Sequence, residues 1–193
     1  MLGLKLPTDP RWVNLAEKSL EEILTDHAYC EQKAASSCIS LIQQYPDFER
    51  IPDEVSPVVT EEWGHFRMVL KELKRRGLKL GRQRTDRYVQ ELLKFQKKGG
   101  TRLEQLMEKL LMAALIEARS CERFRLLSLG LDDEHLRAFY HEFMVSEAGH
   151  YRMFLDLANA YINPETVKSR WQEWLDYEAN LMTRLTPDGK FMH

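Results

Sequence analysis

Hydrophobic and polar positions along the chain show no strand-like alternation with a period of two, and helix start and stop signals dominate instead. Ser19 with Glu22, and Thr101 with Glu104, match the capping-box pattern that closes the first turn of a helix. Asn163 followed by proline indicates another helix start. The expected helices are a short one from Asp9, then 19–45, 56–76, 86–98, 101–129, 132 or 133 to 162, and 163–185.

Four of the expected helices are long, at about 20 to 30 residues, or roughly 30–45 Å at 1.5 Å rise per residue. They pair in chain order as 19–45 with 56–76 and 101–129 with 132–162. Ser56 with the proline after it is interpreted as the start of the second long helix, following a loop over 46–55. The pattern therefore predicts an all-α protein built on two helical hairpins and a long crossover.

A repeated glutamate–histidine spacing carries the most chemical information. Two Glu-x-x-His pairs lie in the second and fourth long helices, and a further glutamate precedes each pair by 30 or 31 residues. Residues three apart share a face of a helix, so each pair can direct a carboxylate and an imidazole to one place. Ferritin-like di-iron and di-manganese bundles have this order of ligands. The candidate metal ligands are Glu31, Glu62, His65, Glu117, Glu147 and His150.

The helix pattern and the ligand order together predict the fold. We expect an all-α, ferritin-like four-helix bundle with additional flanking helices. A length of 193 residues predicts a single domain over 1–193. A basic insert at about 77–101 separates the second and third bundle helices.

The residues beside the candidate ligands favour a buried metal site over ordinary surface glutamates. Small or apolar residues flank Glu31, Glu117 and Glu147, as expected of a packed face. Four glutamates would balance the charge of two Fe(II) ions, and mixed carboxylate and imidazole ligation suits iron or manganese. Six protein ligands for two ions leave coordination positions open. His27, one turn before Glu31, is either a hydrogen-bonding partner of that ligand or an ordinary polar histidine.

Two other acids compete as metal ligands but fit the pattern less well. Glu61 lacks the three-residue spacing to His65, and Glu122 lies off the stripe of Glu117. The four tryptophans are interpreted mainly as packing residues.

The cysteines indicate the compartment. Three cysteines without Cys-x-x-Cys spacing argue against a disulfide scaffold or a zinc knuckle and favour a reducing cytoplasm. No apolar run approaches the roughly twenty residues needed to cross a membrane, and no signal peptide is expected.

Charge is distributed unevenly along the chain. Between Lys71 and Arg102, twelve basic residues face three acidic ones, which gives this segment a charge of +9 and leaves −11 for the rest. Such asymmetry indicates a surface for a polyanion, although a solvated connector is the alternative. Guanidinium groups pair well with phosphate, so the candidate RNA-binding residues are mainly arginines. They are Arg75, Arg76, Lys79, Arg82, Arg84 and Arg87.

Several segments between about Trp12 and Ala179 carry a family resemblance. They are DHAYCEQKAA at 26–35, EEWGHF at 61–66, Arg76-Gly77, IEARSCERF at 116–124 and SEAGHY at 146–151. The chain resembles the tRNA 2-methylthio-isopentenyladenosine hydroxylases (MiaE-like), and the segment at 116–124 is the most specific part.

The resemblance implies a ferritin-like, non-haem di-iron monooxygenase. Its activity would be the O₂-dependent hydroxylation of the isopentenyl group of 2-methylthio-N6-isopentenyladenosine, next to the tRNA anticodon. The six candidate ligands would hold two non-haem iron ions, with Glu62 and Glu147 bridging and Glu31 and Glu117 terminal. O₂ would be the co-substrate.

The resemblance also implies partners. They are the anticodon arm of tRNA and an external electron donor, a reductase or ferredoxin, because the sequence holds no flavin or nicotinamide motif. A cytoplasmic monomer or small oligomer is expected. The alternatives are a ferritin-like iron-oxidising or storage protein, which needs a shell-forming oligomer, and a metal-free helical interaction module.

Overall fold

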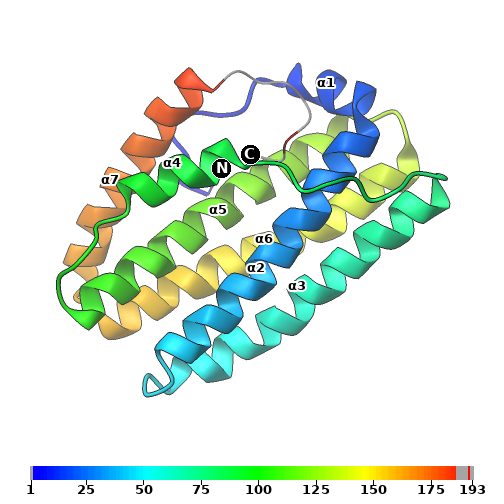
Figure 1. Cartoon of the computed structure of the whole chain (residues 1–193). Helices are drawn as coiled ribbons and strands as arrows, with labels where there is room; N and C mark the ends of the chain where they lie inside the picture. Colours follow the sequence, from blue (N-terminus) through cyan, green and yellow to red (C-terminus); the bar gives the residue numbers. More distant parts are fainter. Residues whose placement is uncertain (1, 186–190, 192–193) are drawn as a thin grey trace. The chain divides into compact units, whose positions relative to one another are not determined.

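The computed structural model describes residues 2–185 and 191, and within them the chain forms seven α-helices and no strand (Figure 1). This confirms the all-α class expected from the sequence. None of the described helices combines the length and the apolar character that crossing a membrane requires. The helices are α1 (Trp12–Lys18), α2 (Leu20–Gln44), α3 (Arg50–Arg75), α4 (Arg87–Phe95), α5 (Arg102–Gly130), α6 (Glu134–Tyr161) and α7 (Pro164–Arg184).

The chain divides into two compact units, each described here by itself. The α2–α3 unit contains residues 14–85 together with Phe191. The α4–α7 unit contains residues 2–13 and 86–185. Helix α1 spans the boundary between them.

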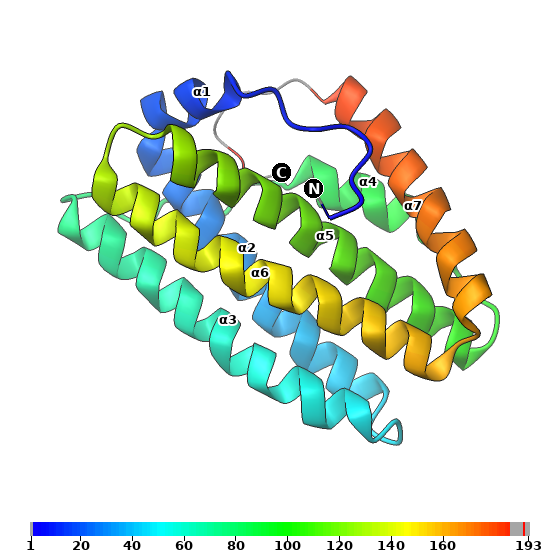
Figure 2. The same ribbon diagram turned by 180° about the vertical axis from the view of Figure 1, so that it is seen from behind.

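The α2–α3 unit is a helical hairpin whose two helices pack side by side along their length (Figures 1 and 2). On α3, buried residues recur every three or four positions at 51, 55, 58, 62, 65, 69 and 73. This spacing keeps them on one face of the helix. Glu62 and His65 therefore belong to the same buried stripe as the apolar residues Val58 and Val69.

The start of α3 differs from the expected one. The helix begins at Arg50 rather than at Ser56, so the loop expected over 46–55 is mostly helical. Pro52 lies in the first turn, where backbone N–H groups have no partner within the helix, so a proline there costs little. Pro57 lies inside the helix, where it removes one backbone hydrogen bond. Complete burial of Ile51 and Val55 offsets this loss.

Apart from the start of α3, the capping signals at Thr101 and Gly77 act as predicted, whereas the one at Ser19 does not. Thr101 and Glu104 form the predicted capping box, with Glu104 N to Thr101 Oγ1 at 3.2 Å and Thr101 N to Glu104 Oε2 at 2.7 Å. Ser19 precedes α2, but its side chain makes no capping hydrogen bond, so the capping box expected there is wrong. Gly77 ends α3 with φ 71°, a left-handed conformation that glycine adopts without strain.

In the α4–α7 unit, α5 and α6 form the second hairpin, and α7 contacts α4, α5 and α6 (Figures 1 and 2). Phe124 on α5 stacks on Tyr140 of α6 with ring centroids 5.7 Å apart and lies 5.5 Å from the ring of Phe143. All three rings are buried. They form an apolar cluster at one end of the hairpin.

Fully buried Arg119 of α5 is the centre of a polar network in the same unit. Its guanidinium donates to Glu178 of α7 at 2.8 Å, to Thr8 Oγ1 at 3.1 Å and to the Leu6 carbonyl at 2.9 Å. Glu122 accepts from Arg119 at 2.5 Å and from both the backbone and the hydroxyl of Thr8 at 2.7 Å. One arginine therefore ties the N-terminal segment and α7 to α5.

The tryptophans do not all pack as expected. Trp12, Trp171 and Trp174 are buried, which agrees with the packing interpretation. Trp63 on α3 is 49% exposed, so that interpretation is wrong for this residue.

Candidate metal centre

Three candidate ligands come together within the α2–α3 unit. Glu31 projects from α2, while Glu62 and His65 are one turn apart on α3, and all three are buried. The Nδ1 atom of His65 lies 3.4 Å from Glu31 Oε2 and 3.7 Å from Glu62 Oε2. One ligand atom from each residue lies within 4.8 Å of the others, so these side chains can surround one ion. We call Glu31, Glu62 and His65 the first triad.

His27 contacts the first triad from the preceding turn of α2. Its Nε2 atom lies 2.7 Å from Glu31 Oε1, and the imidazole is fully buried. Of the two alternatives left open by the sequence, the structure supports a hydrogen-bonding partner of Glu31. Such a bond fixes the orientation of a ligand carboxylate, as is common around metal ions in proteins.

The other three candidate ligands come together within the α4–α7 unit. Glu117 projects from α5, Glu147 and His150 are one turn apart on α6, and all are buried. The Nδ1 atom of His150 lies 3.4 Å from Glu147 Oε2. Ligand atoms of the three again lie within 4.8 Å of one another. We call Glu117, Glu147 and His150 the second triad, and it repeats the residue types and helix positions of the first.

The pKa of the Cys121 thiol reflects the buried, negatively charged surroundings of the second triad. Burial, reinforced by the negative charges of Glu147 and Glu117, raises the pKa of the Cys121 thiol to about 12. The thiol is thus neutral at pH 7, and it donates to the Met144 carbonyl at 3.3 Å. It supplies no thiolate to the triad.

The donor set of each triad fits a metal ion such as iron. Two carboxylates close together in an apolar interior repel each other, and a cation bound between them removes that cost. Oxygen and imidazole nitrogen donors without thiolate suit iron or manganese. Of the two neighbouring acids, Glu61 is half exposed on α3 with its Oε1 atom 4.0 Å from His65 Nε2, and Glu122 is bound by Thr8 and Arg119.

Comparison with known proteins identifies the family. The family model described as tRNA-(MS[2]IO[6]A)-hydroxylase (MiaE) matches residues 2–193. The chain belongs to this family. This confirms the resemblance drawn from the sequence and places the chain among tRNA-modifying hydroxylases.

Two relatives of the MiaE family chain are named tRNA 2-(methylsulfanyl)-N(6)-isopentenyladenosine(37) hydroxylase. The Pseudomonas putida protein is 39% identical over 158 residues, which cover 82% of this chain and 76% of the relative. The Salmonella typhimurium protein is 29% identical over 240 residues, covering 97% of this chain and 86% of the relative.

A solved structure supports the fold of this MiaE family member. Protein 43 with aldehyde deformylating oxygenase activity, from Synechococcus, is 31% identical and superposes with a TM-score of 0.92. The match covers 98% of this chain and 94% of the Synechococcus chain. The ferritin-like fold expected from the helix pattern and the ligand order is thereby confirmed.

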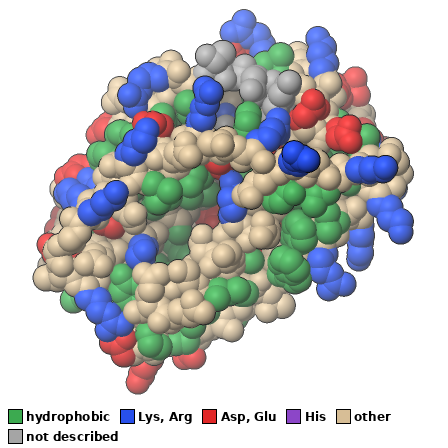
Figure 3. Space-filling view, viewed as in Figure 1, with side chains coloured by type: hydrophobic (Ala, Val, Ile, Leu, Met, Phe, Trp, Pro, Cys, Tyr) green, Lys and Arg blue, Asp and Glu red, His purple; other side chains and the backbone are tan. Residues whose placement is uncertain are grey.

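The six candidate RNA-binding residues have different environments. Arg75 and Arg76 donate to buried Glu72, at 2.8 and 2.5 Å. Arg84 donates to the Glu22 carbonyl of α2 at 2.9 Å and lies over the ring of Phe191. The side chains of Lys79, Arg82 and Arg87 are exposed and form no hydrogen bond or ion pair with another described residue. Figure 3 shows a group of Lys and Arg side chains at its right-hand edge, where α3 ends in Figure 1.

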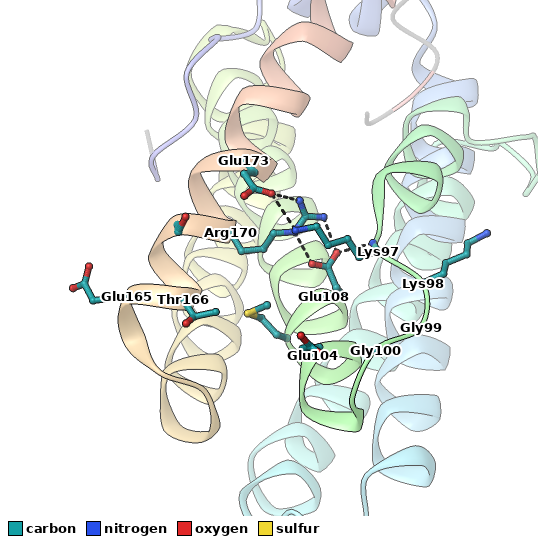
Figure 4. A pocket seen from close by; sticks show the side chains of 12 residues that line it. Lys97, Lys98, Gly99, Gly100, Glu104, Glu108, Glu165, Thr166, Arg170 and Glu173 are labelled. Atoms are coloured by element: carbon teal, nitrogen blue, oxygen red, sulfur yellow. Dashed lines mark hydrogen bonds and ion pairs between the residues drawn. The ribbon is translucent and has the colours of Figure 1, made fainter.

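A cavity of about 700 Å³ in the α4–α7 unit lies apart from all six candidate ligands. It is bounded by the α4–α5 connection and the first turns of α5 and α7 (Figure 4). Arg170 donates to both carboxylate oxygens of Glu108, at 2.5 and 2.9 Å, and to Glu173 at 2.5 Å. Glu108 also accepts from the Lys97 backbone at 3.0 Å. These charges bind one another, so the cavity wall serves to join α5 to α7.

A glycine precedes the histidine in both Glu-x-x-His motifs. A Cβ placed on Gly64 or Gly149 would meet no atom of the described residues within 4 Å beyond its own helix backbone and chain neighbours. Glycine inside a helix costs about 0.5–1 kcal/mol relative to alanine. We therefore expect Gly149→Ala to increase the free energy of unfolding by about this amount, without loss of bound iron. Urea unfolding measures the change, and a less stable variant would contradict the open environment of Gly149.

Proposed function

We propose that this protein is an O₂-dependent monooxygenase that hydroxylates the isopentenyl group of 2-methylthio-N6-isopentenyladenosine, next to the anticodon of tRNA. The observation that carries this proposal is the match of the MiaE family model to residues 2–193, in a chain with two buried Glu, Glu, His triads. The name of the Synechococcus protein, an oxygenase, gives independent support for O₂ as a co-substrate of this fold.

We propose further that each triad holds one iron ion and that the two ions form a non-haem di-iron centre. Glu31, Glu62 and His65 would bind one ion, and Glu117, Glu147 and His150 the other. When bound, iron supplies the chemistry by which O₂, two electrons and two protons convert one C–H bond into C–OH and one water molecule. Nothing in the side chains themselves is an oxidant, so the metal is necessary for this reaction.

The protein's own residues prepare this chemistry. The hydrogen bond between His27 and Glu31 holds one ligand carboxylate in a fixed orientation. Buried apolar residues around the triads, such as Val58, Val69 and Phe143, keep bulk water away. Exclusion of water strengthens the interaction of the carboxylates with metal and limits side reactions.

Electrons must come from outside the chain. The sequence contains no flavin or nicotinamide motif, so we propose a separate reductase or ferredoxin as donor. We also propose that the protein acts in the cytoplasm as a monomer or small oligomer.

An iron-oxidising storage protein would use the same kind of ligands, and the two functions differ in assembly and substrate. Storage requires a closed shell of many subunits, whereas a hydroxylase does not. The family match and the names of both relatives favour the hydroxylase. Size-exclusion chromatography with light scattering distinguishes them, because a large cage would contradict our proposal.

The decisive test is mass spectrometry of nucleosides from tRNA that carries the 2-methylthio-isopentenyl modification. The tRNA is incubated with iron-loaded protein, a reductant and O₂, and the expected product nucleoside is heavier by one oxygen atom. A parallel reaction under ¹⁸O₂ shows whether that oxygen comes from O₂. Absence of the heavier nucleoside, with full iron content and intact tRNA, would contradict the proposed function.

Binding of tRNA is expected to depend on the exposed cations of the predicted RNA-binding set. We predict that the combined change of Lys79, Arg82 and Arg87 to glutamate weakens tRNA binding at least about tenfold and reduces its salt dependence, since each lost phosphate contact lowers the salt slope by about one. Iron content should not change, since these residues lie outside both triads. Fluorescence anisotropy at several salt concentrations measures the effect.

A second comparison separates recognition of RNA from recognition of the nucleoside. Whole tRNA should be hydroxylated far more efficiently than the free modified nucleoside. Equal kcat/KM values for the two substrates would show that the cationic residues do not contribute to recognition.

A further inference from the structure

One side of α3 carries an aromatic and basic surface that neither triad uses. Half-exposed Trp63 lies against Phe66, with ring centroids 4.9 Å apart and planes inclined by 30°. Arg67, Lys71 and Lys74 are exposed and follow Trp63 at intervals of four, four and three residues, which keeps all of them on one side of the helix. We call Trp63, Phe66, Arg67, Lys71 and Lys74 the aromatic–basic face.

Negative charge is nearly absent from this side of α3. The one acid in the sequence between Trp63 and Lys74 is Glu72, which is buried and bound by Arg75 and Arg76. Glu61 is exposed, but at 100° per residue it lies on the opposite side of the helix from Trp63. The aromatic–basic face therefore presents three cations to solvent with no exposed acid between them, and a polyanion complements this charge.

We infer that the aromatic–basic face binds the unpaired part of the tRNA anticodon loop, with a base stacked on Trp63 and phosphates bound by Arg67, Lys71 and Lys74. This inference rests on the proposed function, because it assumes a tRNA substrate. Proteins bind single-stranded RNA by stacking bases on exposed aromatic rings while cations bind the phosphates. The face combines both elements on one helix.

The position of Trp63 in α3 indicates which base of the loop would stack on it. Trp63 follows Glu62, and Phe66 follows His65, so the aromatic pair and two candidate metal ligands share one turn of the helix. Adjacent residues point about 100° apart, so a base on Trp63 lies beside the metal-binding stripe rather than over it. The stacked base is thus a neighbour of the modified adenosine, and stacking holds the loop while the modified base is extruded.

An acidic protein, such as an electron donor, is the other partner that three cations could attract. It has charge to match Arg67, Lys71 and Lys74 but offers no planar base for the exposed indole of Trp63. The aromatic pair therefore favours RNA. The two partners make different predictions for the experiment below.

The experiment measures binding of a synthetic RNA hairpin with an unpaired loop, compared with a fully paired duplex of the same stem. We expect Trp63→Ala to weaken hairpin binding about tenfold, as removal of one base–aromatic stack does, and to leave duplex binding unchanged. Trp63→Phe should retain most of the affinity, because it keeps a stacking ring. The matched control is Ile39→Ala on α2, since Ile39 is 45% exposed and lies outside the face.

The salt dependence of hairpin affinity separates the contribution of base stacking from the contribution of charge. Trp63→Ala should lower hairpin affinity at every salt concentration and leave the slope against salt unchanged. The double variant Lys71→Ala with Lys74→Ala should reduce that slope by about two, one for each phosphate contact. If Trp63→Ala folds poorly, tryptophan fluorescence provides a second measurement of stacking. The hairpin should quench the fluorescence of the natural protein, and this quenching should be absent in Trp63→Phe.

Several outcomes would overturn the inference. They are equal hairpin binding by Trp63→Ala and the Ile39→Ala control, equal losses on hairpin and duplex, or a loss of binding only toward an acidic ferredoxin. Failure of the proposed function is a separate result: natural protein that does not hydroxylate tRNA but binds the hairpin through Trp63 would refute the reaction and support this face.

Discussion

His150→Ala is expected to remove the iron ion that we assign to the second triad and to abolish the proposed hydroxylation of tRNA. His150 is the single nitrogen donor of the second triad. Without it, only the buried carboxylates of Glu117 and Glu147 remain to hold the cation. Loss of a residue that only supports a ligand typically lowers metal affinity about 10–100-fold, and loss of a ligand itself should exceed that. His65→Ala should have the same effect on the first triad.

Iron analysis together with thermal unfolding measures this prediction. The natural protein should bind two iron ions per chain, and each variant about one. At metal concentrations of about 100 times Kd, binding stabilises the folded state by about 2.7 kcal/mol per ion, so each variant should also unfold at a lower temperature. His141→Ala is the control, because His141 is exposed on the same helix as His150. Unchanged iron stoichiometry in both ligand variants would disprove the assignment of the triads.

The sequence predicted the helices and the two Glu-x-x-His pairs because both rest on short-range patterns. The capping box at Thr101 and the glycine that ends α3 act within a few residues, so their effect is readable locally. The Glu-x-x-His spacing likewise places Glu62 beside His65 whatever the rest of the chain does. His27 could be identified as a candidate for the same reason, since it lies one turn from Glu31.

The features that the sequence did not predict depend on tertiary contacts. A loop is expected over 46–55 from the sequence, but burial of Ile51 and Val55 extends α3 back to Arg50. A tryptophan in a ligand helix suggested packing, and only the structure shows that Trp63 is half exposed. Arg119 bonds with residues 59 and 111 positions away, and no local spacing connects partners at such separations.

That same arginine gives the largest expected effect on stability. Arg119→Ala is expected to destabilise the protein by about 3–5 kcal/mol near neutral pH, because removing one partner of a buried ion pair leaves the other charge uncompensated. The stranded groups are Glu178 and Glu122, and the Leu6 carbonyl and Thr8 lose a donor as well. Urea unfolding of the variant and the natural protein at equal iron content measures the loss. The control is Arg125→Ala, which removes an exposed arginine from the same helix.

The loss caused by Arg119→Ala should depend on pH in a defined direction. Burial already raises the pKa of the Glu178 carboxyl, and the positive charge of Arg119 opposes that rise. Without Arg119 the pKa rises further, so the folded variant holds a proton on Glu178 that the unfolded chain has released above its own pKa, about 4.3. A folded state that binds more protons than the unfolded state loses stability as pH increases. The difference in unfolding free energy between natural protein and variant should therefore be smaller near pH 5 than near pH 7.5. A difference that stays constant over this range would show that Glu178 does not depend on Arg119 for its charge.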